Sequence, residues 1–350
     1  MNFAFVGLGI LVIAGIANGS FTLPMKFTRA WEWENTWLIY TLWALVLFPP
    51  LLAWLTVPNL GAVYAAPGAA AIMWTVAACG AGWGISQIFF GLAVEGVGIA
   101  LAFSVILGLS AAVGSLVPLL RQNPGELLQP LGLQVLGGVI LVLIGVGVCA
   151  VAGRRREAAL KPPTAPEASA SGAAAVAAPV RRTTIVQGLI YCLISGVGSA
   201  LVNIGFTEGQ PLQQFAQSHG AAAIWAPNAV WLPLMLAGGI PGWLYCGYLV
   251  KKNHTGDRFR RPATGAYWWL AGLMAIFWFG STVLYGIGAG KLGSLGTVLG
   301  WPVFMSLIVI TASVHGLRTG EWKGSGKQPV RIMYAGIAVL ILAIVVLSRA

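Results

Sequence analysis

Two groups of residues combine an indole ring with hydrogen-bonding side chains at helical spacing: Trp83 with Gln87, and Trp278 with Ser281, Thr282 and Tyr285. Residues three, four or seven apart share one face of a helix, so the members of each group point into the same space. An aromatic face beside amide and hydroxyl groups suits a small molecule that has both hydroxyls and an apolar surface. The alternative is that both tryptophans pack against lipid or lie at the edge of a membrane.

Two asparagines lie within long apolar stretches. Asn18 with Ser20, and Asn203 with Ser199, occupy comparable places in the two halves of the chain. A buried amide is costly without a partner. We therefore expect Asn18 and Asn203 either to contact the same bound molecule or to form hydrogen bonds between neighbouring helices, which is the commoner use of asparagine in a membrane.

The first polar break mixes opposite charges with aromatic residues. Lys26, Glu32 and Glu34 lie beside Trp31 and Trp33. One interpretation is a gate whose ion pairs break and reform, with Lys26 and Glu34 as its members. The other is a belt of ion-paired side chains that extend from the membrane edge into water.

Three further charged residues lie at the ends of apolar stretches. Glu95 occupies a very tight turn and Glu208 directly follows an apolar segment, so either carboxyl could couple a proton if it were partly desolvated. The alternative for both is an ordinary solvated loop carboxylate. Lys291 follows a glycine-rich stretch, where it would attract an oxygen of a bound molecule, close a gate, or simply anchor a helix at the interface.

Long apolar segments must position all of these residues. The 350-residue chain is 58% hydrophobic and only 8% charged, whereas a soluble domain is typically about one-quarter charged. A bilayer core of roughly 30 Å is crossed by about 20 helical residues, and continuous rather than alternating apolar runs favour helices over a barrel. We predict an all-α membrane protein with ten transmembrane helices at 3–23, 36–56, 69–93, 97–120, 131–151, 184–205, 224–249, 264–287, 292–314 and 331–348.

The ten segments form two groups of five. Residues 1–151 and 184–350 flank a break at 152–183 that is rich in Ala, Pro and Ser, which is typical of a flexible linker. Corresponding residues recur at a constant offset of 195 positions: Trp83, Gly91 and Gly98 as Trp278, Gly286 and Gly293. At another offset, Gly7 and Gly15 match Gly188 and Gly196. We predict two five-helix inverted repeats, with the faces of Trp83 and Trp278 meeting between them.

The basic residues indicate an orientation. All but three of the 20 lie in the breaks that follow the odd-numbered segments, the exceptions being Arg121, Lys291 and Arg349. Because basic loops stay in the cytoplasm, we expect the linker to be cytoplasmic and both termini to lie outside, in the inner (plasma) membrane of the cell. The net charge of +11 is then an orientation signal and no indication of nucleic-acid binding.

Other classes of protein lack their usual signals. The four cysteines and three histidines show no metal-ligand or redox spacing, so we expect no metal and no cofactor other than a coupling cation. There is no phosphate-binding loop, and we find no nucleophile, base or paired-acid motif of an enzyme. The linker is rich in Ala and Pro and cannot fold into a signalling domain.

Several segments resemble the L-rhamnose/proton symporter family of the drug/metabolite transporter superfamily. The most specific is the first break, with Pro24-Met25-Lys26, Arg29, Trp31-Glu32-Trp33-Glu34 and Trp37. Others follow in the same order along nearly the whole chain: Gly80 to Ile85, Gly91-Leu92, Gly98-Ile99, Gly114-Ser115-Leu116 with Pro118, Leu143 to Gly147, Trp301, and Gly320-Glu321-Trp322-Lys323. The resemblance implies a ten-helix carrier for a small sugar, with the substrate path between the two halves.

The resemblance has one departure that bears on energy coupling. Where this chain has Ala289 and Thr297, the family carries a histidine and an aspartate at the start of the ninth helix. An ionisable residue in a membrane is a default candidate for a proton relay. Its absence at both positions puts the coupling ion, and the choice of rhamnose as substrate, in question.

The expected function is secondary active transport. We predict import of a monosaccharide, L-rhamnose or a related sugar, by symport with a cation, the proton, through alternating access of the two halves. The alternative within the same superfamily is an exporter of drugs or metabolites, and aromatic cavities with few charges suit either. The oligomeric state is not indicated by the sequence.

Overall fold

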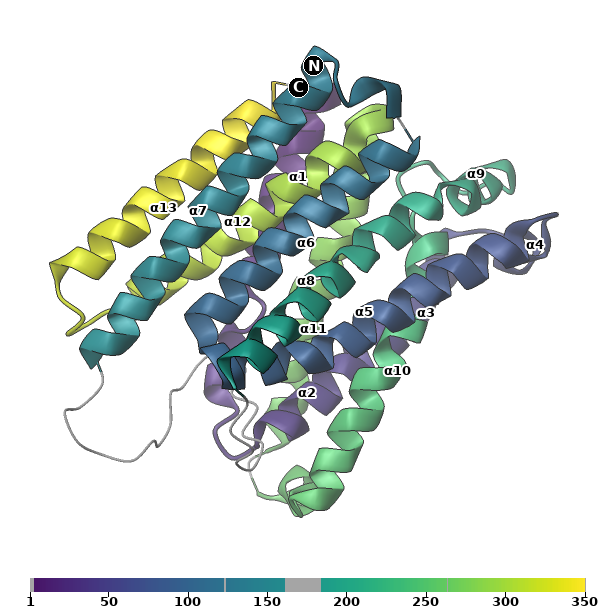
Figure 1. Cartoon of the computed structure of the whole chain (residues 1–350). Coiled ribbons are helices and arrows are strands. Elements are labelled where there is room, and N and C mark those ends of the chain that lie inside the picture. Colours follow the sequence, from purple (N-terminus) through teal and green to yellow (C-terminus); the bar gives the residue numbers. More distant parts are fainter. Residues whose placement is uncertain (1–2, 123, 161–183, 263, 350) are drawn as a thin grey trace.

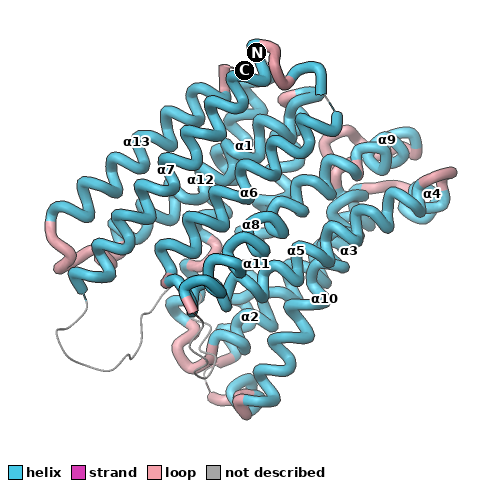
Figure 2. Tube along the Cα trace, in the orientation of Figure 1, coloured by secondary structure: helices cyan, strands magenta, loops and turns pink. Residues whose placement is uncertain are grey.

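The computed structural model describes residues 3–122, 124–160, 184–262 and 264–349, and in that part of the chain it contains helices but no strand (Figures 1 and 2). Ten segments are long and apolar enough to cross a membrane: Phe5–Phe27, Trp33–Thr56, Ala69–Val97, Ile99–Gln122, Pro130–Leu160, Ile185–Ser218, Asn228–Lys252, Gly265–Lys291, Gly293–Arg318 and Lys327–Leu347. The all-α prediction with ten spans is confirmed.

The α-helices in chain order are α1 (Phe3–Ser20), α2 (Trp33–Thr41), α3 (Phe48–Thr56), α4 (Leu60–Ala65), α5 (Ala69–Val97), α6 (Ile99–Gln122), α7 (Pro130–Leu160), α8 (Ile185–Glu208), α9 (Gln210–Ser218), α10 (Asn228–Lys252), α11 (Gly265–Lys291), α12 (Gly296–Arg318) and α13 (Lys327–Leu347). The short helices α4 and α9 were not predicted, and they pack against each other. Helix α7 continues beyond the predicted end at 151, so the start of the predicted linker is helical. Residues 161–183 of that linker lie outside the described part.

The second span is a helix with an irregular centre. Between α2 and α3, residues Leu42–Leu47 form a π-helical segment that leads directly into Pro49 and Pro50. Proline has no N–H and its ring excludes the carbonyl of the preceding turn, so the helix must change its hydrogen-bond pattern just before it. The change of pitch separates α2, which lies near the first loop, from α3.

Both chain ends lie at one end of the bundle, as Figure 1 shows, and we call this the terminal end. Three loops that carry basic residues lie at the other end, which we call the basic-loop end: 21–32, 253–262 and 319–326. Helices α7 and α8, which flank the linker, also meet it at that end. The predicted grouping of basic residues on one side of the membrane therefore matches the arrangement of the helices.

Helices of the first and second halves pack together in matching pairs. Helix α5 packs along α8 and α10, while α11 packs along α1 and α2; α6 contacts α8, and α12 contacts α1. By order along the two halves, the counterparts are α1 and α8, α2 and α10, α5 and α11, and α6 and α12. When each helix is exchanged for its counterpart, the contacts of the first half become those of the second. Helices α7 and α13, counterparts of each other, pack together on one side of the bundle (Figure 1).

Two glycines that the sequence analysis matched also make matching contacts. A Cβ on Gly7 of α1 would lie 3.2 Å from the side chain of Leu292, and one on Gly188 of α8 would lie 2.7 Å from Val97. Leu292 and Val97 are themselves 195 positions apart. These contacts support the prediction of two repeats, which stays a prediction.

Candidate functional site

A central cavity of about 420 Å³ lies among eight of the long helices, from both halves of the chain. Its volume falls in the range of roughly 300–1,000 Å³ that small-molecule sites occupy. Most of the wall is apolar or aromatic. The polar side chains on it, apart from those at the basic-loop end, include Asn18, Thr41, Gln87, Ser110, Ser199 and Thr282.

Trp83 of α5 and Trp278 of α11 meet on the cavity wall. Their rings are stacked, with centroids 5.5 Å apart and planes 13° apart. Tyr40 of α2 approaches Trp278 edge-on at 6.3 Å. The absence of a side chain at Gly238 makes room for Trp83, since a Cβ there would lie 2.6 Å from the indole ring. The predicted pair is thus brought together between the halves, and its role in binding stays a prediction.

The polar residues beside the two tryptophans are arranged in a matching way. Gln87 Nε2 donates to Ser199 Oγ at 3.2 Å, and Asn18 Nδ2 donates to Ser281 Oγ at 2.8 Å. Ser281 donates in turn to the carbonyl of Trp278 at 2.6 Å. Within the described residues the side-chain oxygens of Asn18 and Gln87 accept no hydrogen bond. Both oxygens belong to cavity-lining residues and are available to a ligand hydroxyl.

Asn203 lies away from the cavity, whereas a residue that binds the ligand there would line it. Its side chain is fully buried and does not line the cavity. Nδ2 donates to the carbonyl oxygens of Gly114 at 2.7 Å and Thr297 at 3.0 Å, and Oδ1 accepts from the Tyr285 hydroxyl. In this structure the amide therefore joins α8 to α6, α11 and α12, which is the alternative that the sequence analysis left open.

Tyr285 lines the cavity and belongs to an aromatic cluster towards the terminal end. Its ring lies 5.1 Å from Phe304 and 5.4 Å from Trp301, centroid to centroid. Behind it Phe206 stacks on Trp231 at 4.3 Å, and all five rings are buried. Three of these rings, Tyr285, Trp301 and Phe304, form part of the cavity wall.

At the basic-loop end the cavity reaches Lys26 and Glu321, which form an ion pair. Lys26 Nζ lies 2.8 Å from Glu321 Oε1. Arg156 lies 3.9 Å from the other carboxylate oxygen and donates to the Glu321 carbonyl at 2.8 Å. The predicted gate residue Lys26 thus pairs with the loop before α13 and not with Glu34. Glu321 was quoted only as part of a resemblance, and nothing local in the sequence indicates its partner.

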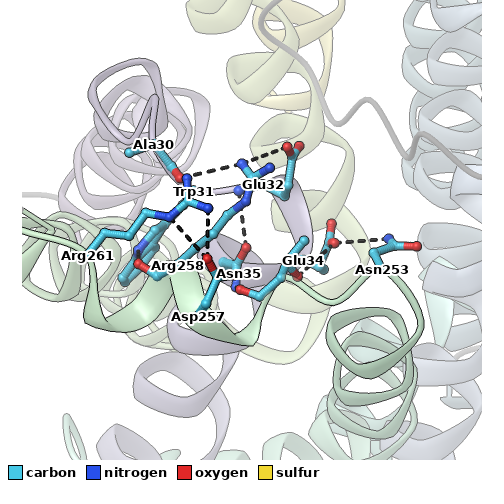
Figure 3. A network of polar contacts seen from close by, with 10 residues as sticks. Ala30, Trp31, Glu32, Glu34, Asn35, Asn253, Asp257, Arg258 and Arg261 are labelled. Atoms are coloured by element: carbon cyan, nitrogen blue, oxygen red, sulfur yellow. Dashed lines mark hydrogen bonds and ion pairs between the residues drawn. The ribbon is translucent and has the colours of Figure 1, made fainter.

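Glu34 belongs to a separate network that joins the first loop to the loop after α10 (Figure 3). The carboxylate is buried and accepts hydrogen bonds from Asn253 at 3.0 Å and Thr255 at 3.1 Å. Nearby, Glu32 pairs with Arg258 at 2.7 Å. Neither glutamate lines the cavity.

The same network includes an exposed pair between the short segment Gly256–Arg260 and the residue that follows it. Arg261 contacts Asp257 at 2.8 Å, and this hydrogen bond holds the pKa of the Asp257 carboxyl below its ordinary value. Arg258 lies close enough to act in the same direction. The network ties the two loops together outside the cavity.

Three predicted charged residues do not line the cavity. Glu95 is exposed near the end of α5 at the basic-loop end, and Lys291 is exposed at the end of α11. Glu208 is partly buried and pairs with Arg121 at 3.1 Å at the terminal end. Their roles in gating or coupling stay predictions, and none of the three touches the cavity.

Other cavity residues were missed by the sequence analysis. Trp37, Tyr40 and Tyr245 line the wall, and so does His315, whose Nε2 lies 2.8 Å from Ser20 Oγ. The sequence analysis considered His315 only as a possible metal ligand. Metal-ligand spacing gives no information about which residues line a cavity. In the described part of the chain no group of three His, Cys, Asp or Glu side chains could hold a metal ion.

A bundle that crosses the membrane ten times around one central, partly polar cavity defines a membrane transporter. The family model described as L-rhamnose-proton symport protein (RhaT) matches residues 1–350, so the chain belongs to that family. It is a carrier and not an enzyme.

Curated relatives are similar over nearly their whole length. The L-rhamnose-proton symporter of Yersinia pestis (strain Pestoides F) is 26% identical over 355 residues, which cover 98% of this chain and 97% of the relative. That of Pectobacterium atrosepticum is 25% identical over 341 residues, covering 95% and 93%. The resemblance that the sequence analysis stated is confirmed.

The ion pair at the cavity mouth gives a first testable prediction. We expect Lys26→Met and Glu321→Gln each to change the initial uptake rate several-fold, because each removes one partner of the ion pair where the cavity meets water. The double variant should be no worse than the more affected single variant, since removing both partners removes the interaction only once. Initial uptake rates in proteoliposomes measure this.

The control is Asp257→Asn, which breaks an exposed pair outside the cavity and should leave uptake within about twofold, since exposed pairs contribute little. Effects of Lys26→Met and Glu321→Gln that simply add in the double variant would show that the two side chains act independently.

Proposed function

We propose that this protein imports L-rhamnose, or a closely related monosaccharide, together with protons across the inner membrane. Family membership and the central cavity support the proposal, as do relatives that are named L-rhamnose-proton symporters. The observation that carries it is the stacked pair Trp83 and Trp278 on the wall of that cavity.

The cavity wall offers both kinds of contact that a sugar needs. Aromatic rings cover the apolar C–H surface of a sugar, while amide oxygens accept hydrogen bonds from its hydroxyls. The indoles of Trp83 and Trp278 and the open oxygens of Gln87 and Asn18 would play these parts. A deoxy sugar such as rhamnose, with a methyl group in place of a hydroxymethyl group, suits a wall with few polar groups.

The two ends of the cavity support a mechanism of alternating access. The aromatic cluster lies towards the terminal end, while the cavity reaches the loops at the basic-loop end. Because basic loops stay in the cytoplasm, we assign this structure to an inward-facing state. In the outward-facing state, the cluster of Phe206, Trp231, Tyr285, Trp301 and Phe304 would separate and the loops would close.

The two positions at which the sequence departs from the family, 289 and 297, carry no ionisable side chain. Ala289 and Thr297 are both buried, and neither ionises. The Thr297 hydroxyl is buried without a hydrogen-bond partner in the described part of the chain. A proton must therefore be coupled through another side chain.

The exporter alternative is not favoured. Membership of a symporter family of this kind points to uptake, and the structure adds no observation for export.

The test is uptake of radiolabelled L-rhamnose into proteoliposomes with and without an inward proton gradient. We expect accumulation above the external concentration only with the gradient, and inhibition by unlabelled L-rhamnose but not by D-glucose. Equilibration without accumulation would contradict proton coupling. No uptake at all, while another monosaccharide accumulates, would contradict the substrate.

A further inference from the structure

Few ionisable side chains reach the cavity. Those on its wall within the described residues are Lys26, Tyr40, Tyr245, Cys246, Tyr285, His315 and Glu321. Tyrosine, cysteine and lysine ordinarily release their protons above pH 8. Glu321 is engaged in ion pairs with Lys26 and Arg156. Histidine alone ordinarily changes its charge between pH 5 and 8.

The hydrogen bonds around His315 indicate where its protons are. Ser20 Oγ donates its single proton to the carbonyl of Ile16 at 2.7 Å. With the proton placed in this way the same oxygen accepts from His315, and we assign the proton of the neutral ring to Nε2, which lies 2.8 Å away. The structure gives Nδ1 no partner in the described part of the chain. Nδ1 is therefore the nitrogen that gains and loses a proton.

We propose that His315 is the side chain that carries the coupled proton, on Nδ1, in place of an ionisable residue at Ala289 or Thr297. This rests on the proposed function, since it assigns the proton site of that symport. The proton would bind from the cavity and leave to it, while the Nε2–H donates to Ser20 in both charge states.

The position of His315 lets its charge influence the opening of the cavity. Its hydrogen bond joins α12 of the second half to α1 of the first. The charged groups around this end of the cavity are Lys26 from the first loop, Arg156 from α7, and Glu321 from the loop before α13. Arg318, on the same helix as His315, is exposed. A charge gained at His315 would arise on the wall of the same cavity as the Lys26–Glu321 pair.

The first arm of the test needs no substrate. Histidine labelled with 15N is incorporated into the full-length protein in lipid nanodiscs, and His315 is assigned by comparison with His315→Gln. We expect the neutral ring to carry its proton on Nε2 and to gain the second proton on Nδ1 between pH 5 and 8. A ring whose neutral form is protonated on Nδ1, or that does not titrate in this range, would overturn the proposal.

The second arm separates coupling from sugar movement. We expect His315→Gln, whose amide can still donate to Ser20, to continue exchange of labelled for unlabelled L-rhamnose but to lose at least tenfold in gradient-driven accumulation. Proton entry, measured with a pH-sensitive dye inside the vesicles, should no longer follow sugar addition. The matched control is His219→Gln, on a histidine at the end of α9 outside the cavity, which should behave like the unaltered protein.

The outcomes separate this proposal from the proposed function. Accumulation and sugar-driven proton entry by His315→Gln at the level of the unaltered protein would overturn the role of His315 and leave the symport intact. If the unaltered protein moves no L-rhamnose, the proposed substrate fails. The role of His315 is then decided by the nanodisc titration alone, and it falls if the ring does not titrate between pH 5 and 8.

Discussion

Replacing Trp83 with alanine is expected to weaken L-rhamnose binding by about 10- to 100-fold while the protein still inserts and folds. The indole stacks on Trp278 at 5.5 Å and lines the cavity, so its loss removes one aromatic face from the ligand and loosens the other. Aromatic contacts of this kind contribute about 0.5–1.5 kcal/mol beyond the area they bury. Together with that lost area, the change corresponds to one or two factors of ten.

The measurement is equilibrium binding of labelled L-rhamnose to the purified protein in nanodiscs. Trp74→Ala is the matched control, because Trp74 lies on the same helix but is 70% exposed on the outside of the bundle. Trp83→Phe should recover part of the affinity, since it restores an aromatic face. Equal affinity of Trp83→Ala and the unaltered protein would remove the tryptophan pair from the binding site.

A single methyl group at Gly84 is expected to destabilise the packing of the two halves. A Cβ at this position would lie 2.1 Å from the carbonyl oxygen of Gly238, and a Cβ at Gly80 would lie equally close to that of Leu234. Because the obstacle is backbone and cannot rotate away, Gly84→Ala must push α5 and α10 apart. Overpacking of this kind typically costs about 1–3 kcal/mol, and here it acts between the two halves.

We expect Gly84→Ala to lower the thermal unfolding midpoint in detergent by several degrees and to reduce rhamnose exchange, because Trp83 next to it would move with α5. Gly137→Ala on α7 is the control, since nothing lies within 4 Å of a Cβ there. If Gly84→Ala were as stable as Gly137→Ala, the two helices would not be held at the close distance that the structure shows.

The pair of tryptophans shows how far a local pattern reaches. Spacing placed Gln87 on the face of Trp83, and the offset between halves predicted that Trp83 and Trp278 would meet; they do meet. Both inferences depend on the helical period and on repetition along the chain, which are properties of neighbouring residues. The same reasoning could not predict the role of Asn203, because its amide contacts either a ligand or a neighbouring helix according to which carbonyl groups lie opposite it.

The charged residues show the limit more clearly. Lys26 was grouped with Glu34, its neighbour in the sequence, but it pairs with Glu321 on a distant loop, and Glu34 faces Asn253 and Thr255. An ion pair forms wherever packing brings opposite charges within reach. Which charges meet depends on the rotation of each helix about its axis and on its neighbours in the bundle. A local sequence pattern predicts neither.

The sequence by itself therefore determined the membrane environment, the ten spans and the uneven distribution of basic residues, since transfer of a segment into lipid depends on the summed hydropathy of about 20 consecutive residues. Only the tertiary structure decided which side chains share the central cavity. It placed His315 on the wall and Glu95, Glu208 and Lys291 off it. The physical reason is that a cavity is a joint property of many helices, whereas hydropathy is a property of each helix alone.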